Sequence, residues 1–579
     1  MKAKNLPTTQ WRLFEGDKDI QDMLIRELRL HRIVSCILMS RHILTPDDAN
    51  KYLNPSLNNL HNPFLMKDMQ KAVQRLIKAI YHREKIVVYG DYDADGVTSV
   101  VVLLKFLMEI GHDASYYIPD RITEGYGLNN PAIDRMKADD VKLIVTVDCG
   151  ISDHEQISYA RTLGIDTIVL DHHEVPNSLP DAVAIIDQNR KECAFPFKHL
   201  AAVGIVFNFL IALRGKLRNE GFWETRKYPN LREYLDLVAL GTIGDICPLI
   251  DENRIFTKIG LDLITEGKRV GLQALKEICG IDAQVIDSGK ASFCLIPRIN
   301  AAGRVALAKE AVQLLLTDNI DDARRIAQSL EHYNRRRQTM ERAIFNEILE
   351  EIKINLEPKN VRSLVFSSDK WHPGVIGIVA SKLVDRFNRP TILISIKDGI
   401  GKGSGRSIAD FNIYLGLKKC DSLLLSYGGH RYAAGISIKE EDIKEFSRML
   451  EENISKEINL SEFVSQTNID AMCNLNDIDH ELISQIGRLA PFGSGNPEPV
   501  LCVKNITVTS QSVVGNNHLW MRLTGDGVSY NSIWFNKGYL IDFLPGSDID
   551  IAFTPHINSW NGAYDIQLKM KDMSVPPII

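Results

Sequence analysis

The alternation of short apolar runs with helical segments constrains the fold of this chain more than any other feature. The runs are rich in β-branched and aromatic side chains and cover residues 85–89, 115–118, 143–147, 167–170 and 183–186. Continuous apolar runs of this length, separated by helical segments, are typical of strands buried on both faces of a parallel sheet. The sequence therefore predicts an α/β domain with a parallel sheet.

Four other segments flank this domain. We expect an N-terminal helical extension over residues 1–80, the parallel-sheet domain over 81–320 and a long, highly charged connecting helix over 321–355. A smaller α/β domain is expected at 356–460, and several β-rich runs at 461–579 suggest a small barrel or sandwich. The predicted fold class is a multidomain α/β protein with a β-rich C-terminal domain.

Charge and cysteine content limit the partners and the compartment. The 579 residues carry a formal net charge of −6, which argues against indiscriminate electrostatic binding to nucleic acid or membranes but allows a local basic groove. The nine cysteines are scattered and form no C-x-x-C pair, so a reducing compartment fits best. The N-terminus has no apolar signal region, and the most apolar stretch, 97–110, is interrupted by Lys105. We expect a cytoplasmic protein that does not enter membranes.

Acidic residues follow the predicted strands. The first strand runs into Asp91, Asp93 and Asp95, and later apolar segments end in other acidic or imidazole side chains, namely Asp148, Asp171, His172, His173 and Asp245. Open α/β sheets build their sites at the carboxyl ends of the strands, so these side chains are expected to gather. Clustered carboxylates repel one another unless cations lie among them. Oxygen ligands with one or two imidazoles favour Mn²⁺ or Mg²⁺ over a thiolate zinc site.

Three other interpretations of these residues were considered. D-x-D-x-D-G also begins an EF-hand loop, but the continuation after Gly96 is apolar and lacks the required Glu. A single aspartate at a strand end is commonly a helix N-cap, although four such positions favour a metal site. Cys149 follows Asp148, but no activating pair for a nucleophilic thiol is evident.

Nine motifs, in this order along the chain, resemble a known family. GDYDADG, VTVDCG, VLDHH and GTIGDI resemble the DHH phosphoesterase superfamily. PRINAAGR, WHPGVIGIVAS, GSGRS, GGHRYAAG and PFGSGNPEP, which follow between residues 297 and 499, are similar to those of the RecJ family of bacterial exonucleases within it. The resemblance covers about residues 80 to 500. It implies that the two α/β units are the DHH and DHH-associated domains and that the β-rich C-terminal domain is an oligonucleotide-binding (OB) barrel.

The resemblance also implies roles for individual residues. Asp93 and Asp148 would hold one divalent ion, and a second ion, Mn²⁺ or Mg²⁺ like the first, would be held by Asp95, Asp148, His172 and Asp245. Two such ions activate a water molecule and neutralise the leaving oxygen in phosphodiester hydrolysis. Asp91 and His173 would lie beside them as catalytic residues, and Asp171 would orient an imidazole.

The smaller α/β domain is implied to bind the 5′-terminal phosphate of the substrate. Glycines at 401, 403 and 405 would let backbone N–H groups approach an anion, as in a phosphate-binding loop, and an ordinary flexible turn is the alternative. The proposed phosphate ligands are Ser404, Arg406 and His430, with Arg298 and Arg304 reaching in from the segment between the lobes. A fixed distance between this phosphate and the metals would explain cutting from the 5′ end.

Aromatic and basic side chains elsewhere are ambiguous. Trp371 is expected either to stack on a base or to serve in the core, and Trp520, Trp534 and Tyr539 of the barrel carry the same two possibilities. The arginines of residues 324–342 are interspersed with acids, so a solvated connecting helix is at least as good an interpretation as a track for DNA.

The resemblance implies a metal-dependent 5′-to-3′ exonuclease that degrades single-stranded DNA to mononucleotides in recombination and repair. We expect a monomer that acts with a single-strand-binding protein and a helicase. The enzyme alternative is an oligoribonuclease or cyclic-dinucleotide phosphodiesterase of the same superfamily, which the region beyond residue 460 disfavours. The alternative of another class is a non-catalytic nucleic-acid-binding scaffold, which the complete set of acidic and His residues disfavours.

Overall fold

The computed structural model describes residues 10–355, 360–460, 466–515, 517–543, 548–560 and 563–574. The chain forms two compact units, residues 60–463 and a second unit in which residues up to 59 join residues from 464 onward. The domain boundaries given above stay predictions. No helix among the described residues is long and apolar enough to cross a membrane.

The first sheet of the larger unit is fully parallel, as predicted. Its strand order is β3-β2-β4-β5-β6. The strands are β2 (Lys85–Gly90), β3 (Ala114–Tyr117), β4 (Val141–Val147), β5 (Asp166–Leu170) and β6 (Ala184–Ile186). The central strands β2, β4 and β5 are almost entirely buried, which is why their sequences are continuous apolar runs without alternation.

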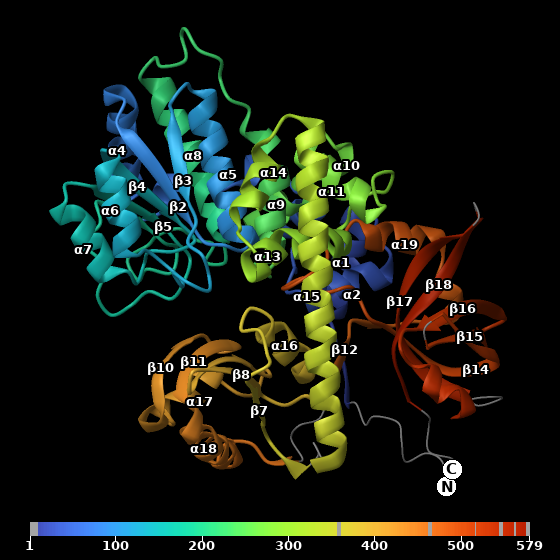
Figure 1. The fold of residues 1–579 in the computed structure, drawn as a ribbon. Coiled ribbons are helices and arrows are strands. Elements are labelled where there is room, and N and C mark those ends of the chain that lie inside the picture. Colours follow the sequence, from blue (N-terminus) through green and yellow to red (C-terminus); the bar gives the residue numbers. More distant parts are fainter. Residues whose placement is uncertain are drawn as a thin grey trace. The chain divides into compact units, whose positions relative to one another are not determined.

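Helices cover both faces of this sheet (Figure 1). One face packs against α4 (Met69–His82), α5 (Ala94–Glu109) and α8 (Ala202–Asn219), and the other against α6 (Asn130–Ala138) and α7 (His154–Thr162). Because the strands are parallel, their carboxyl ends meet at one edge, where the acidic segments follow.

A helical layer continues the first domain beyond the sheet. It contains α9 (Leu235–Gly244), α10 (Asp251–Glu266), α11 (Val270–Cys279), a π-helical turn (Ala291–Leu295), α13 (Ile296–Val305) and α14 (Lys309–Leu316). Helix α9 is buried on nearly all sides, and α10 packs closely on it because a Cβ at Gly260 would lie 2.1 Å from the carbonyl oxygen of Leu235. This packing holds α9, whose C-cap is Asp245, against α10.

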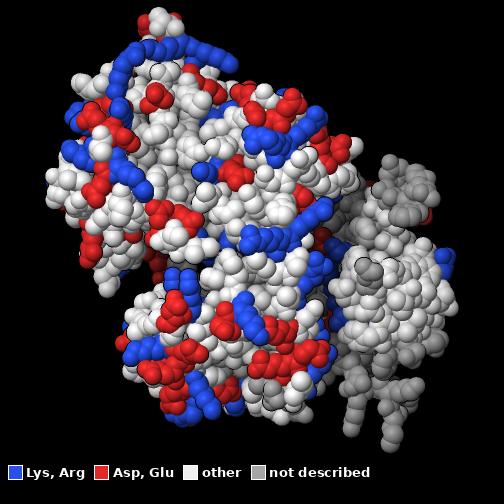
Figure 2. Space-filling model, viewed as in Figure 1, with Lys and Arg blue, Asp and Glu red and all other residues white. Residues whose placement is uncertain are grey.

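The predicted connecting helix is α15 (Ile320–Asn355), a single helix of 36 residues. Four of its arginines have carboxylate partners: Arg324 pairs with Glu277, Arg325 with Asp322, Arg335 with Glu331 and Arg337 with Glu341. On the face of the molecule shown in Figure 2, blue and red side chains are likewise interspersed. These pairings support a connecting helix and not a track for DNA.

The second sheet of this unit has the order β10-β11-β9-β8-β7. Its elements are β7 (Leu364–Ser368), α16 (Ile376–Phe387), β8 (Thr391–Lys397), β9 (Ile400–Arg406), α17 (Ile413–Lys418), β10 (Leu424–Gly429), β11 (Ala433–Lys439) and α18 (Ile443–Ser455). Only β7 and β8 are parallel, and the other neighbours are antiparallel. The smaller α/β domain predicted from the sequence is therefore confirmed.

Residues 400–406 form the central strand of this sheet, so the expectation of a phosphate-binding loop there is wrong. The backbone of β9 pairs with β8 on one side and β11 on the other. Gly401, Gly403 and Gly405 share one face, on which isoleucines fill the space that side chains would take; a Cβ at Gly403 would lie 2.5 Å from Cγ1 of Ile436. Ser404 and Arg406 therefore point to the opposite face.

The smaller unit contains a closed barrel of five strands, in the cyclic order β14-β15-β16-β18-β17, as predicted. Its strands are β14 (Leu501–Val514), β15 (His518–Gly525), β16 (Val528–Trp534), β17 (Asp548–Trp560) and β18 (Ala563–Ser574). Pairing of β14 with β17 closes the barrel, and β16 and β18 are parallel. Trp534 lies in the barrel core, so of the two roles considered for it the structure shows the packing role.

The N-terminal segment packs with the barrel. Its elements are β1 (Gln10–Leu13), α1 (Lys18–Leu28), α2 (Arg32–Ser40) and α3 (Pro46–Leu53), and the C-terminal part adds β12 (Gln466–Ile469), β13 (Ala471–Met472) and α19 (His480–Gly487). Strand β1 pairs in parallel with β12, and α2 shares a core with the barrel.

The glycine face of β9 generates a prediction about stability. We expect Gly403→Ala to lower the stability by about 1–3 kcal/mol, because the added methyl must displace Ile436 or Ile394 in a packed core. The matched control is Gly435→Ala on β11, whose Cβ would meet only one atom, 3.9 Å away. Thermal and denaturant unfolding would measure both variants. Equal effects of the two substitutions would contradict this packing.

Candidate metal and phosphate site

The loop from β2 to α5 carries three of the predicted site residues. Asp93 is the N-cap of α5: its Oδ1 accepts hydrogen bonds from the backbone N–H groups of Asp95 at 2.9 Å and Gly96 at 3.2 Å. Asp91 is buried, and its Oδ1 has no hydrogen-bond partner among the described residues. Gly96 allows the tight turn, because a Cβ there would lie 2.5 Å from the carbonyl oxygen of Asp91.

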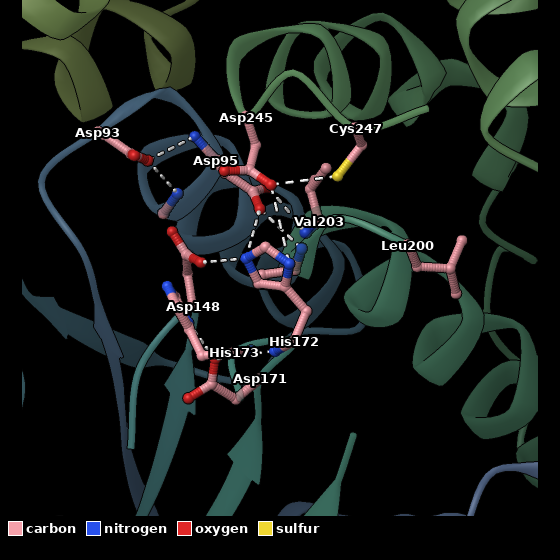
Figure 3. Close-up of polar contacts among 12 residues, drawn as sticks. Asp93, Asp95, Asp148, Asp171, His172, His173, Leu200, Val203, Asp245 and Cys247 are labelled. Atoms are coloured by element: carbon pink, nitrogen blue, oxygen red, sulfur yellow. Dashed lines mark hydrogen bonds and ion pairs between the residues drawn. The ribbon is translucent and has the colours of Figure 1, made fainter. Parts of the chain in front are cut away.

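The carboxylate of Asp95 lies against the first turn of α8 (Figure 3). Its Oδ2 accepts from the N–H of Ala202 at 2.7 Å and its Oδ1 from the N–H of Val203 at 2.9 Å. These N–H groups have no partner within their own helix, and the helix dipole favours a negative charge at this end. Asp95 therefore caps a helix 107 residues away and still has lone pairs that can bind a cation.

Asp148, His172 and Asp245 complete the centre of the cluster (Figure 3). Asp148 follows β4 with φ of 62°, a left-handed conformation that turns the backbone sharply at the strand end. Its Oδ1 lies 3.1 Å from Nε2 of His172, and Oδ2 of Asp245 lies 3.7 Å from Nδ1 of the same ring. Side chains from β4, β5 and α9 thus meet around one imidazole.

Asp171 organises the turn that bears the two histidines. Its oxygens accept from the backbone N–H groups of Ile151 at 3.0 Å and His172 at 2.8 Å, and from Nδ1 of His173 at 2.7 Å. Burial disfavours its charged form, but these contacts with His173 outweigh burial and hold the pKa of Asp171 at about 2. Burial likewise disfavours charged His173, yet Asp171 raises the pKa of that imidazole to about 9.

The cluster carries more negative charge than it can hold by itself. Burial, followed by repulsion from Asp245, raises the pKa of Asp95 to about 7. Burial and neighbouring carboxylates also raise the pKa values of Asp91, Asp93 and Asp148. Donor atoms of Asp91, Asp93 and Asp148 lie within 4.8 Å of one another, as do those of Asp148, His172 and His173. Oxygen donors with few imidazoles and unbalanced charge fit hard divalent cations.

Helix α13, which contains the PRINAAGR motif, supports the acidic loop. The Oδ1 of Asn300 accepts from the N–H of Ala94 at 2.7 Å, at the start of α5. A Cβ at Gly303 would lie 2.2 Å from the carbonyl oxygen of Tyr92. The Asn and the Gly of this motif, Asn300 and Gly303, therefore act by holding the loop of Asp91 and Asp93 in place.

Three arginines lie near the acidic loop and one another. Burial, followed by repulsion from Arg121, lowers the pKa of Arg304 to about 10, and the same two causes lower the pKa of Arg406. Arg121 stacks on the ring of Tyr92, with 4.9 Å between its guanidinium carbon and the ring centroid. Partly buried like charges held together in this way favour an anion between them.

Arg121 was not among the residues predicted from the sequence. This residue follows β3 by four positions, so it lies near the carboxyl end of a strand, where open α/β sheets build their sites. No motif marks it, because it lies in a turn with few apolar neighbours in sequence.

The remaining predicted phosphate ligands occupy different surroundings. Oγ of Ser404 lies 3.1 Å from Nη1 of Arg406. His430 is half-exposed, lies 3.5 Å from Glu174 and stacks near His173, with 6.1 Å between the ring centroids. Arg298 instead pairs with Glu331 of α15 at 2.7 Å and donates to the carbonyl of Cys294. The structure therefore does not bring Arg298 together with Arg304 and Arg406.

Two other sequence candidates have packing roles. Trp371 is buried in the core of the second α/β domain, and its Nε1 donates to Glu347 at 3.0 Å, so it does not present its ring to a base. Cys149 is buried with its thiol 3.8 Å from the carbonyl oxygen of Tyr89, and burial raises the pKa of this thiol well above its usual value. In the barrel, Tyr539 is exposed and Trp520 is half-buried.

The parallel sheet, the acidic cluster at its carboxyl edge and the second α/β domain define a DHH protein. The family model described as DHH family, N-terminal domain, matches residues 85–242, the DHHA1 domain model matches 360–456, and the RecJ OB domain model matches 469–572.

Comparison with individual relatives is more specific. The chain is 37% identical over 571 residues to the single-stranded-DNA-specific exonuclease RecJ of Bacillus subtilis, covering 98% of this chain and 71% of that protein. It is 36% identical to the Escherichia coli protein of the same name, covering 87% of this chain and 89% of that one. The crystal structure of RecJ from Thermus thermophilus in complex with Mn²⁺ superposes with a TM-score of 0.84 and 28% identity, covering 99% of this chain and 80% of that chain. This chain belongs to the RecJ family.

The raised pKa values predict how stability changes with pH in the absence of metal. Asp95 titrates near pH 7 in the folded state but near 4 when unfolded, so its contribution to stability falls as pH rises between these values. His173, with a folded pKa of about 9, loses its stabilising contribution between about pH 6.5 and 9. With EDTA present, we expect the unfolding temperature to fall on the order of 5 °C from pH 5.5 to 8.

Divalent cations should reverse this trend. Mn²⁺ is expected to raise the unfolding temperature more at pH 8 than at pH 5.5, because protons compete with the metal for the carboxylates at the lower pH. Scanning fluorimetry at both pH values would measure the difference, and Asp95→Asn should reduce it. A larger effect of Mn²⁺ at pH 5.5 would contradict the assigned pKa of Asp95.

Proposed function

We propose that this chain is a metal-dependent exonuclease that hydrolyses phosphodiester bonds of single-stranded DNA from the 5′ end, releasing mononucleotides in recombination and repair. One observation carries the proposal: a buried Asp/His cluster at the carboxyl edge of a DHH sheet, in a chain that aligns along most of its length with exonucleases named for this activity. The metal requirement is supported by the RecJ structures from Thermus thermophilus, which are in complex with Mn²⁺ and with Mg²⁺.

We assign the metal ligands from the cluster. Asp93 and Asp148 would hold one ion, Asp148 would bridge, and the second ion would be held by Asp95, Asp148, His172 and Asp245. The unbalanced charge of these buried groups supports two cations. When bound, two divalent ions supply activation of a water molecule and stabilisation of the charge that develops on the phosphate.

The chain's own residues prepare this centre. The first turns of α5 and α8 hold Asp93 and Asp95 through backbone N–H groups, so these carboxylates need no rearrangement to bind. In the metal-free chain, Asp171 raises the pKa of His173 to about 9, which favours its protonated form. A protonated imidazole beside the cluster can donate a hydrogen bond to the scissile phosphate, which is the role we assign to it. Asp91 would act beside it from the buried loop.

We assign the 5′-terminal phosphate to the side chains opposite the glycine face of β9. Ser404 and Arg406 lie together there, and Arg304 and Arg121 bring further positive charge. His430 would contribute from the β10–β11 turn. Arg298 lies on the same helix as Arg304, but its ion pair with Glu331 gives it less support as a phosphate ligand.

The remaining assignments concern the whole protein. We propose that the barrel binds single-stranded DNA and that Tyr539, which is exposed, is a stacking residue there. A single-strand-binding protein and a helicase are proposed partners of a monomeric enzyme. The nine free cysteines support a reducing, cytoplasmic location.

The first test follows labelled single-stranded DNA in Mn²⁺ with the label at either end. Wild-type protein should release a labelled mononucleotide at once from the 5′ label and only late from the 3′ label. Asp148→Ala should reduce the rate by at least about 10³-fold, because it removes the bridging ligand. Intact DNA together with hydrolysis of short RNA or cyclic dinucleotides would reassign the substrate, and no hydrolysis of any of them would favour a binding scaffold.

A second test concerns the phosphate anchor. Arg406→Ala should raise the KM for a 5′-phosphorylated substrate by roughly 10-fold or more, the loss of one charge-assisted pair, and leave Mn²⁺ affinity unchanged. Lys402→Ala is the matched control, because Lys402 lies on the same face of β9 and is exposed. A rise in KM accompanied by an equal loss of Mn²⁺ affinity in Arg406→Ala would count against the assignment.

A further inference from the structure

Cys247 lies at the edge of the Asp/His cluster, and none of the roles above uses it. The residue follows α9 two positions after Asp245, and only 8% of its surface is exposed. Its thiol donates to Oδ2 of Asp245, with 3.1 Å between sulfur and oxygen (Figure 3). In the sequence, this cysteine is one of nine that form no C-x-x-C pair.

Three donors of different chemistry converge at this point. One atom each from His172, Asp245 and Cys247 lies within 4.8 Å of the others. The contact from sulfur to carboxylate oxygen is 3.1 Å, and Nδ1 of His172 lies 3.7 Å from the same oxygen. Ligand atoms around a tetrahedral zinc ion, at bond lengths of about 2.0–2.3 Å, are about 3.5 Å apart. Both measured separations are near this value.

The two ring nitrogens of His172 face different neighbours, and Asp245 also lies near Asp93 and Asp95. The Nε2 atom of this ring faces Asp148 at 3.1 Å and Asp95 at 3.9 Å, whereas its Nδ1 faces Asp245. The oxygen-rich side suits Mn²⁺ or Mg²⁺, and the side that contains sulfur suits a softer ion, because thiolates select Zn²⁺ and related metals over hard cations.

We propose that His172, Asp245 and Cys247 form a binding site for a thiophilic divalent ion of the Zn²⁺ or Cd²⁺ type, and that this ion inhibits the enzyme. The sulfur–metal bond forms as the thiol proton passes to solvent, and water fills the fourth position, as in three-ligand zinc sites. Inhibition follows because the ion binds His172 and Asp245, two side chains that the catalytic centre needs as metal ligands. This consequence rests on the proposed function, whereas binding of the ion does not.

A binding experiment tests the site without any nuclease assay. Co²⁺, which takes zinc sites and absorbs in the near ultraviolet when bound to a thiolate, would be titrated into metal-free, reduced protein. We expect a thiolate-to-Co²⁺ absorption band in wild type that is lost in Cys247→Ser and Cys247→Val and kept in Cys36→Ser, a control that retains the hydrogen bond from Gln21. Circular dichroism would identify any variant that fails to fold. No band in wild type, or an undiminished band in the folded Cys247 variants, would overturn the proposal.

An inhibition experiment tests the consequence. Zn²⁺ would be titrated into reactions with saturating Mn²⁺, and each variant's rate would be normalised to its own rate without Zn²⁺. The Zn²⁺ concentration for half-inhibition should rise roughly tenfold or more in Cys247→Ser and stay unchanged in Cys36→Ser. Equal inhibition of both variants would overturn the inhibitory role. If the protein proves to have no nuclease activity, the Co²⁺ band still decides whether the site exists.

Discussion

Mutual repulsion among buried carboxylates is the constraint on which the rest of this structure depends. The fold holds four carboxyl groups close together in a medium that screens charge poorly, namely those of Asp91, Asp93, Asp95 and Asp148. Their pKa values are raised because ionising them there is unfavourable. A protein tolerates such an arrangement only if its backbone prevents the carboxylates from moving apart. The helix N-termini at α5 and α8, the left-handed turn at Asp148 and the close approach of α13 all serve this purpose.

The periodicity of the sequence was sufficient to predict much of the architecture. Both α/β domains follow from apolar runs whose length and spacing distinguish strands from helices. The connecting helix was predicted from its charged sequence, and the barrel from the family resemblance, because the β-rich runs alone also allowed a sandwich. Packing between distant segments was not predictable in this way. The pairing of β1 with β12 joins residues more than 450 positions apart, and nothing in either segment identifies its partner.

The errors have identifiable physical causes. Glycines at alternate positions of β9 suggested a loop. A strand also has glycine at every second position when neighbouring side chains leave no room for a Cβ on one of its faces. Trp371 and Trp534 were ambiguous because an aromatic ring suits a core as well as a base. The cluster itself was predictable, since strand ends converge, but Arg121 and Cys247 lie in turns where only the folded chain shows what they contact.

The placement of Ser404 and Arg406 on a central strand also affects the entropy of the proposed binding of a 5′-terminal phosphate. A phosphate-binding loop must lose backbone freedom when its ligand arrives, at about 1–2 kcal/mol for each residue ordered. Strand β9 is fixed by ladders on both sides, so its backbone has already lost this freedom during folding. In the proposed function, a phosphate bound by this strand would contact a pre-organised anchor, and the free energy of its contacts would be available for holding the end of the DNA.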